Sequence, residues 1–196
     1  MNTNPAYQDG AWENRREELI GGETVMMPPA STNHNRITRN ISRIFSNYLH
    51  GRRCEPFSDG EAVYLTEEDR FIPDFMIVCD PEKIQWDGVH GAPDLVVEVL
   101  SPGTAKNDRC RKRECYEACG VREYWLINPG EHSIEVYLAG KKGFVLHDIH
   151  TLFPDWQLAR MNETERASVS THFKCSLFND LDISLADIFY RTFETN

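Results

Sequence analysis

The architecture of this chain follows from the segment Pro93-Asp-Leu-Val-Val-Glu98-Val-Leu-Ser-Pro102 and the charged run behind it. Residues Leu95 to Leu100 are apolar at nearly every position, which favours a strand covered on both faces by helices. Pro102-Gly103 ends that strand. One acid, Glu98, interrupts it. Because an ionised carboxylate there is costly unless a cation or donor meets it, Glu98 is the first candidate for a functional residue.

The charged run predicts a helix that begins near Thr104 to Asp108 and ends at Cys119, before Gly120. Its residues Asp108, Lys112 and Tyr116 are four apart and so share one face. The next apolar run, Tyr124 to Ile127, predicts a strand parallel to the first, because a helical crossover returns the chain in the same direction.

A second apolar run, Phe71 to Cys79, carries Asp74 near its start. If this strand pairs antiparallel with Leu95 to Leu100, Asp74 lies beside Glu98. Hard divalent cations such as Mg²⁺ take one or two carboxylates together with phosphate oxygens. The pattern therefore indicates phosphate chemistry at one sheet edge.

These residues resemble a known family. Pro73-Asp74, Glu98 in its apolar strand and the basic helix resemble the PD-(D/E)XK nuclease superfamily, whose core is an α-β-β-β-α-β unit. More narrowly, the chain resembles the bacterial "putative restriction endonuclease" family sometimes called Uma-two, over about residues 18 to 189. The motifs that carry the likeness are Glu18-Leu-Ile-Gly-Gly-Glu23, Ala92-Pro-Asp-Leu-Val-Val-Glu-Val-Leu-Ser-Pro102, Asp108-Arg109 with Lys112 and Tyr116, and Gly120-Val-Arg-Glu-Tyr-Trp-Leu-Ile-Asn-Pro129.

The resemblance implies an α/β, restriction-endonuclease-like fold, a mixed sheet flanked by helices. The sequence adds a C-terminal β-hairpin about Gly140-Lys-Lys-Gly143. For the site, the resemblance implies Asp74 and Glu98 as metal ligands and Glu18 as an additional acid. The superfamily motif places Lys two residues after Glu98, where this chain has Leu100, and Lys112 matches the position to which the lysine has moved in the narrower family.

The expected function is Mg²⁺- or Mn²⁺-dependent endonucleolytic hydrolysis of phosphodiester bonds, with DNA as the substrate. The alternative is a catalytically inactive nuclease-fold module that binds nucleic acid or a partner protein. A third alternative is a homodimer whose contact surface is what selection has preserved. The expected partner is nucleic acid, and no association with a membrane is expected.

Residues 33 to 53 contain five arginines and no acid, although the whole chain has a formal net charge of −10. Ser31 begins a predicted helix from Asn33 to Leu49, with its arginines opposite the apolar stripe. A solvated helix face is the alternative to phosphate contact. His34 suits a helix cap better than a phosphate contact. The candidate nucleic-acid contacts are Arg36, Arg39, Arg43 and Arg109.

The composition, with 196 residues of which 40% are hydrophobic, suits one globular domain. We expect a flexible leader at residues 1–12, a short helix or turn from Trp12 to Leu19, and one restriction-endonuclease-like domain over residues 13–196. No apolar run approaches 18 residues and the N-terminus is polar, so we expect a cytoplasmic protein. The six cysteines lack C-x2-C pairs, which favours free thiols over a zinc site or disulfides.

Overall fold

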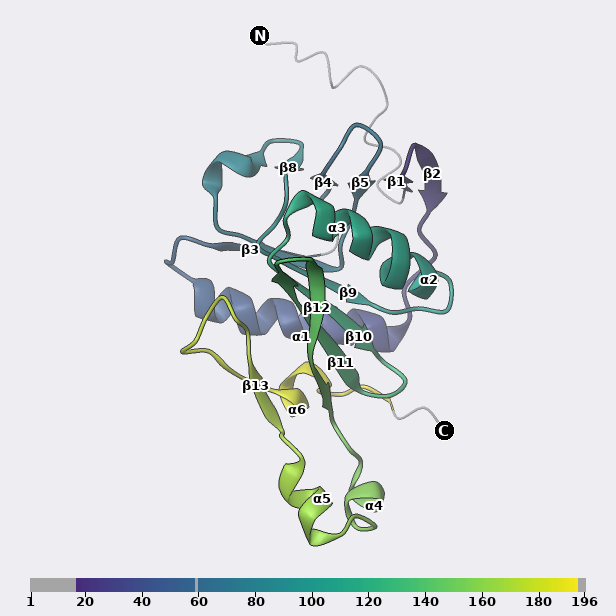
Figure 1. Ribbon diagram of the computed structural model, residues 1–196, viewed down its shortest axis with the longest axis vertical. Helices are drawn as coiled ribbons and strands as arrows, with labels where there is room; N and C mark the ends of the chain where they lie inside the picture. The colour runs from purple at the N-terminus through teal and green to yellow at the C-terminus, as the bar shows by residue number, and fades with distance from the viewer. Residues whose placement is uncertain (1–16, 59, 194–196) are drawn as a thin grey trace.

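The computed structural model describes residues 17–58 and 60–193 (Figure 1). The expected leader at residues 1–12 lies outside this range, and the domain boundary at residue 13 stays a prediction. Within the described residues, Glu17–Ile20 forms a strand, β1, and not the helix or turn expected from Trp12 to Leu19. It pairs antiparallel with β2 (Glu23–Met26) across Gly21-Gly22, whose φ angles of 56° and 79° suit a tight hairpin.

The main sheet has six strands in the order β12-β11-β10-β9-β6-β3. Strands β9 and β10 are parallel and every other neighbouring pair is antiparallel, as the helical crossover between β9 and β10 requires. The bounds are β3 Glu55–Ser58, β6 Phe75–Val78, β9 Leu95–Val99, β10 Glu123–Asn128, β11 Ser133–Gly140 and β12 Gly143–Thr151. Together with the helices before β3 and after β9, this confirms the predicted α-β-β-β-α-β order and the hairpin that follows it.

A smaller sheet has six short strands in the order β2-β1-β5-β4-β8-β7. The new members are β4 Val63–Tyr64, β5 Arg70–Phe71, β7 Ile84–Gln85 and β8 Gly88–His90, with a 3₁₀ turn η2 at Pro81–Lys83. The predicted single strand from Phe71 to Cys79 is therefore wrong in one respect. The chain leaves β5 at Phe71, passes Pro73, and enters β6 of the main sheet at Phe75. Because proline has no N–H to donate to a ladder, Pro73 suits this crossing point.

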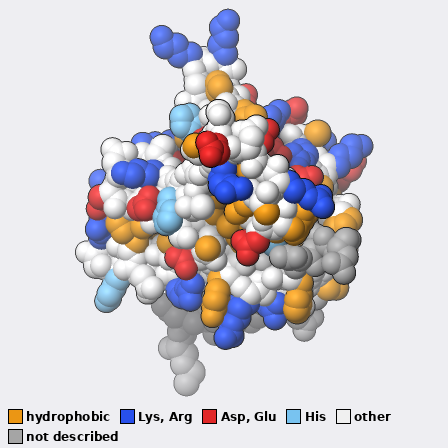
Figure 2. Space-filling model, turned by 90° about the horizontal axis from the view of Figure 1, so that it is seen from below, with side chains coloured by type: hydrophobic (Ala, Val, Ile, Leu, Met, Phe, Trp, Pro, Cys, Tyr) orange, Lys and Arg blue, Asp and Glu red, His pale blue; other side chains and the backbone are white. Residues whose placement is uncertain are grey.

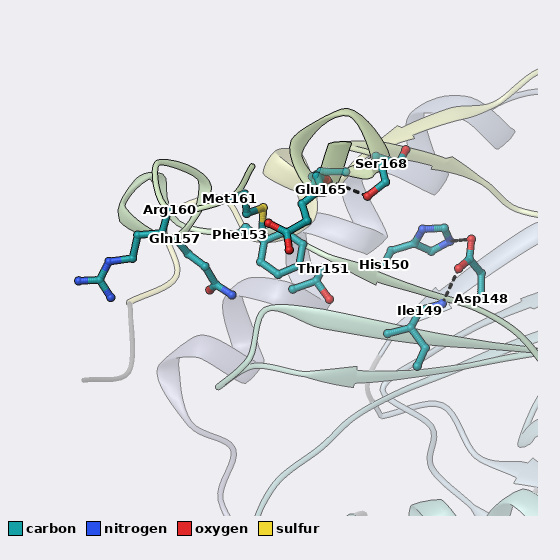
Figure 3. Close-up of a pocket in the computed structure, with 12 residues that line it drawn as sticks. Asp148, Ile149, His150, Thr151, Phe153, Gln157, Arg160, Met161, Glu165 and Ser168 are labelled. Atoms are coloured by element: carbon teal, nitrogen blue, oxygen red, sulfur yellow. Dashed lines mark hydrogen bonds and ion pairs between the residues drawn. The ribbon is translucent and has the colours of Figure 1, made fainter. Parts of the chain in front are cut away.

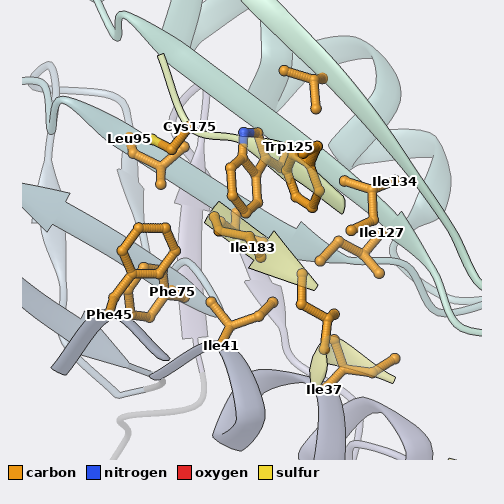
Figure 4. Close-up of a cluster of buried hydrophobic side chains, with 14 of the residues drawn as sticks. Ile37, Ile41, Phe45, Phe75, Leu95, Trp125, Ile127, Ile134, Cys175 and Ile183 are labelled. Atoms are coloured by element: carbon orange, nitrogen blue, oxygen red, sulfur yellow. The ribbon is translucent and has the colours of Figure 1, made fainter. Parts of the chain in front are cut away.

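Each face of the main sheet is covered by a different layer. Helix α1 (Thr32–Leu49) lies along one face, where its residues Ile37, Ile41 and Phe45 meet Phe75 and Trp125 (Figure 4). The C-terminal elements close this layer: β13 His172–Lys174, β14 Asp182–Ser184 and α6 Leu185–Ile188. The opposite face is covered by the small sheet and the helix between β9 and β10.

The helix between β9 and β10 is continuous but changes pitch. It consists of α2 (Ala105–Asn107), a π-helical turn η3 (Asp108–Lys112) and α3 (Arg113–Cys119). Gly120, at φ 93°, ends it in the left-handed conformation predicted from the sequence. The π-helical turn was not expected, and such turns occur often at functional sites.

Two cysteines are bonded, which corrects the expectation of free thiols. Cys54 and Cys79 lie next to the register pair Glu55 and Val78, so the β3–β6 ladder places them opposite each other in a disulfide. The sequence separates them by 25 residues, and only the strand pairing brings them together. The cysteines that remain free, as expected, are Cys110, Cys115, Cys119 and Cys175.

Beyond β12 the chain makes an excursion away from the small sheet through α4 (Asp155–Leu158) and α5 (Glu163–Ser168) (Figure 1). A capping box between Asn162 and Glu165 begins α5. On the face drawn in Figure 2, basic, acidic and apolar side chains of the described residues are intermixed. Within residues 17–58 and 60–193, no helix has the length and apolarity that crossing a membrane requires.

Candidate active site

Glu98 lies on the face of β9 that the following helix covers. Side chains alternate along a strand, so Val97 and Val99 point to the α1 layer while Val96, Glu98 and Leu100 point to the other side. Leu100, at the usual lysine position of the motif, shares the face of Glu98 and packs in the apolar layer. A lysine that serves Glu98 must then come from the helix above this face.

Lys112 is that lysine. It comes from the π-helical turn, and its side chain is only 3% exposed. Its Nζ lies 2.7 Å from Glu98 Oε1, 2.9 Å from Glu18 Oε1 and 3.5 Å from Asp108 Oδ1. Three buried carboxylates, from β1, β9 and the helix, thus share one ammonium group.

Asp74 and Glu18 are both held by backbone amides. The Val99 N–H donates to Asp74 Oδ2 at 2.7 Å, so the start of β6 meets the end of β9 as the antiparallel pairing predicts. The Ile72 N–H donates to Glu18 Oε1 at 2.8 Å, which joins β1 to the crossing segment between the two sheets. Each acid is thereby fixed on the wall of the same pocket.

The pocket has a volume of about 440 Å³. The segment that follows β2 and the first turn of α1 line it with Pro28, Pro29 and His34. Four carboxylates and one ammonium, all buried, also line it, from Glu18, Asp74, Glu98, Asp108 and Lys112. One ammonium cannot balance four carboxylates if all of them ionise, so a bound cation would favour their ionised forms.

Burial raises the pKa of Glu98 well above its ordinary value, the Lys112 ammonium opposes that shift, and the neighbouring carboxylates add to it. Burial also raises the pKa of Asp108, again against the opposing effect of Lys112. For Lys112, burial acts to lower the pKa, but the surrounding carboxylates outweigh it and raise the pKa well above the usual range. Lys112 therefore stays charged, while burial disfavours the ionised forms of Glu98 and Asp108.

Two further residues of the site, Asp108 and Tyr116, were not among the predicted site residues. Asp108, 2% exposed, lies 3.5 Å from the Lys112 ammonium, one helical turn away along the chain. Tyr116 packs in the core against Phe71, and its hydroxyl also donates to Glu98 Oε1 at 2.9 Å. The sequence did place both residues on the helix face of Lys112, four positions away on either side. That face belongs to the candidate site because it packs against Glu98 of β9.

The donor chemistry of the pocket fits a hard divalent cation. Asp74 and Glu98 offer carboxylate oxygens from neighbouring strands, and one or two carboxylates with phosphate oxygens suffice for Mg²⁺. Within the described residues, no group of three or more His, Cys, Asp or Glu side chains already has a metal-holding arrangement. The fit is therefore to an ion that also takes substrate or water oxygens, and not to a closed protein cage.

The arginines predicted to contact nucleic acid lie away from this pocket. Arg36 donates to the carbonyl of Arg191 and stacks over Phe193, with 4.3 Å from guanidinium carbon to ring centre. Arg43 lies 6.0 Å from the ring centre of Tyr190. Arg39 is exposed on α1, and Arg109 forms an ion pair with Glu135 of β11. None of the four lines the carboxylate pocket.

Larger hollows lie near the α4–α5 excursion. One of about 560 Å³ lies between β12 and the two short helices, and its ionisable lining residues are Asp148, His150, Arg160 and Glu165 (Figure 3). Another of about 700 Å³ lies beside it. Neither brings buried carboxylates and an ammonium together, so size alone does not identify the site.

Comparison with known proteins places the chain in a family. Residues 8–170 match the family described as "Uma2: Putative restriction endonuclease". The protein sll1609 of Synechocystis, uncharacterised, is 32% identical over 126 residues, which cover 62% of this chain and 71% of that relative. The uncharacterised protein slr1290 from the same strain is 28% identical over 165 residues, covering 82% of this chain and 81% of that relative.

A solved structure has the same fold. It is described as a putative nuclease belonging to DUF820 from Anabaena variabilis, and it matches with a TM-score of 0.65 at 19% identity over 88% of this chain and 89% of that one. The mixed sheet flanked by helices is thus a restriction-endonuclease-like fold. The family match supports a nuclease function in general terms, and with most of its length matched, this chain belongs to the Uma2 family.

Proposed function

We propose that this chain is a divalent-metal-dependent endonuclease that hydrolyses phosphodiester bonds in nucleic acid, with DNA as its substrate. The observation that carries the proposal is the pocket lined by four buried carboxylates and a single buried ammonium. Membership of the Uma2 family supports it. Such a pocket attracts a cation, and a lysine beside that cation suits a reaction in which negative charge builds up on a phosphoryl group.

Asp74 and Glu98 are the proposed ligands for Mg²⁺ or Mn²⁺, together with a backbone carbonyl near Val99. When bound, the metal would supply charge stabilisation at the phosphoryl oxygens and make water a better nucleophile. The Val99 N–H already fixes one oxygen of Asp74, and the Tyr116 hydroxyl fixes one oxygen of Glu98. Donors of this kind hold ligating carboxylates in position.

Lys112 and Glu18 act beside the ligands. The Lys112 ammonium, held among Glu98, Glu18 and Asp108, is placed to stabilise charge on the phosphoryl oxygens or to orient the attacking water. Glu18, fixed by the Ile72 N–H, is placed to hold that water or a second cation. The catalytic residues proposed are thus Asp74, Glu98, Lys112 and Glu18.

The test of cleavage uses purified wild type and Glu98→Gln. Both are incubated with single-stranded, duplex and supercoiled DNA and with RNA, in Mg²⁺, in Mn²⁺ and in EDTA. We expect the wild type to cut DNA in a metal-dependent way and Glu98→Gln to lose both cleavage and metal binding. A wild type that cuts none of these substrates would favour the alternative, an inactive nuclease-fold module.

Metal binding is tested by titration calorimetry on the wild type and Asp74→Ala, without substrate. We expect binding in the micromolar to millimolar range by the wild type and a clear loss in Asp74→Ala. Asp180→Ala is a matched control, because Asp180 is an exposed acid that pairs with Arg52 outside the pocket. Equal binding by the wild type and Asp74→Ala would remove this metal site.

Nucleic-acid contact by the α1 arginines is a separate proposal. Replacing Arg36, Arg39 and Arg43 with Ala should weaken binding across sequences and reduce the salt slope by about 0.9 log unit for each lost contact on B-DNA. An unchanged slope would mean that Arg36 and Arg43 only contact the C-terminal residues of this chain.

The homodimer is likewise a proposal, tested by sedimentation at two protein concentrations.

A further inference from the structure

His34 belongs to the pocket through its side chain and not to the helix cap. Ser31 caps α1, because its Oγ accepts the His34 backbone N–H at 3.2 Å. The His34 imidazole, 12% exposed, points instead to the carboxylate pocket and lines it. The expectation that His34 caps the helix is therefore wrong for the imidazole, which has another partner.

That partner is Asp74. His34 Nε2 lies 3.1 Å from Asp74 Oδ2, the oxygen that also accepts the Val99 N–H at 2.7 Å. The Val99 hydrogen bond and the His34 contact thus both involve this one oxygen of Asp74. Contacts on Oδ2 from the sheet and from α1 restrain the rotation of the carboxylate.

We propose that His34 is a positioning residue for Asp74, and this inference rests on the proposed metal-dependent function. The imidazole donates its Nε2–H to Oδ2 and sets the orientation in which Oδ1 meets the cation. Donors that hold a ligating carboxylate or imidazole typically change metal affinity by about 10–100-fold when they are removed. The same contact ties the first turn of α1 to the start of β6, so the helix takes part in the ligand geometry.

The rival role for His34 is direct metal ligation through Nε2. A ligating nitrogen must be free of its proton, whereas a nitrogen that donates to a carboxylate oxygen must carry it. The two roles also differ in metal preference. An imidazole ligand favours Co²⁺ and Ni²⁺ over Mg²⁺, whereas an orienting donor has no such selectivity of its own.

The experiment measures metal affinity by calorimetry, with the metal alone, for wild type, His34→Ala and His34→Gln. His34→Ala should bind Mg²⁺ and Mn²⁺ about 10–100-fold more weakly. His34→Gln, which keeps an N–H donor, should recover most of the loss. Asn47→Ala, an exposed change on the same helix, is the matched control and should bind as the wild type does. Melting in EDTA checks that each variant is folded.

Two further measurements separate the roles. Nitrogen-15 NMR of the metal-free protein should find the His34 proton on Nε2, and the loss of affinity in His34→Ala should be similar for Mg²⁺ and Co²⁺. A neutral imidazole protonated on Nδ1, or a loss confined to Co²⁺ and Ni²⁺, would overturn the positioning role. Unchanged affinity in His34→Ala overturns this inference alone, whereas a wild type that binds none of these metals overturns the proposed function as well.

Discussion

Replacing Lys112 with Met tests directly whether its ammonium stabilises the buried carboxylates of the pocket. Met is close to Lys in length but has no charge, so Glu18, Glu98 and Asp108 would lose the ammonium that lies 2.7 to 3.5 Å from them. Removing one partner of a buried ionic group typically costs about 3–5 kcal/mol, because it leaves buried charge uncompensated. For a chain of this size each kcal/mol shifts Tm by about 2–4 °C, so a fall of roughly 10 °C is expected.

The assay is thermal melting in EDTA, repeated with increasing Mg²⁺. The metal should restore part of the loss, by about 2.7 kcal/mol at a hundred times its Kd, because it neutralises the same carboxylates. The double variant Lys112→Met with Glu98→Gln should melt above Lys112→Met, since one unpaired carboxylate is gone. Lys106→Met, at an exposed lysine of the same helical segment, should stay within about 0.5 kcal/mol of wild type.

Cleavage by Lys112→Met should fall by roughly 10²–10³-fold, the scale for loss of one preorganised charge-stabilising donor. Metal affinity should remain, since Lys112 is not a ligand. Two results would refute the reasoning. A Tm within 1 °C of wild type, on the order of the scatter between ordinary surface variants, would mean that the ammonium does not balance the acids. Full cleavage would mean that it does not serve the reaction.

Three other changes have defined outcomes. Tyr116→Phe removes the hydroxyl that donates to Glu98 and should cost about 1.5–3 kcal/mol in denaturant unfolding, with equal midpoints arguing against this hydrogen bond. The pKa values of Glu98 and Asp108 are higher in the folded protein than their unfolded values of 4.5 and 3.8. Their contribution to the free energy of unfolding is therefore complete below the unfolded pKa values and is lost as pH rises through the folded ones. In EDTA, the Tm of wild type should therefore fall more from pH 5 to 8 than that of Glu98→Gln, and parallel slopes would contradict this. Cys54→Ser should lower the stability of the oxidised protein by about 3–4 kcal/mol, the loop-closure value for the separation between Cys54 and Cys79, and should differ little from wild type once both are reduced.

Much of the main sheet can be predicted from local sequence signals. The apolar run around Glu98 and the helix ending at Gly120 specify a parallel crossover almost by themselves, and Ser31 specifies the start of α1. The small sheet is harder, because its strands β4, β5 and β7 have only two residues each and show no readable alternation. Turn signals were available there in the Gly21-Gly22 pair of the β1–β2 hairpin and in Asp87-Gly88 at the turn from β7 into β8.

Some residues of the candidate site can also be placed from local sequence signals, and others only from the tertiary fold. Antiparallel pairing predicts that Asp74 and Glu98 converge, and the helix face predicts where Lys112 points. The burial of Asp108 cannot be predicted locally, because it depends on the π-helical turn and on the strand packed beneath it. The Cys54–Cys79 bond is equally invisible, because only the ladder between β3 and β6 places those residues opposite each other.

Two acids of the pocket, Glu18 and Glu98, come from different sheets. Glu98 belongs to a long, buried sheet, whereas Glu18 comes from a sheet of short strands and reaches the pocket beside the crossing at Pro73. Short, partly exposed elements open locally at a lower free energy than a core sheet. A substitution in the small sheet could therefore withdraw Glu18 from the pocket while spectroscopic signals from the main sheet stay native. For this chain, intact secondary structure is no guarantee of an assembled site.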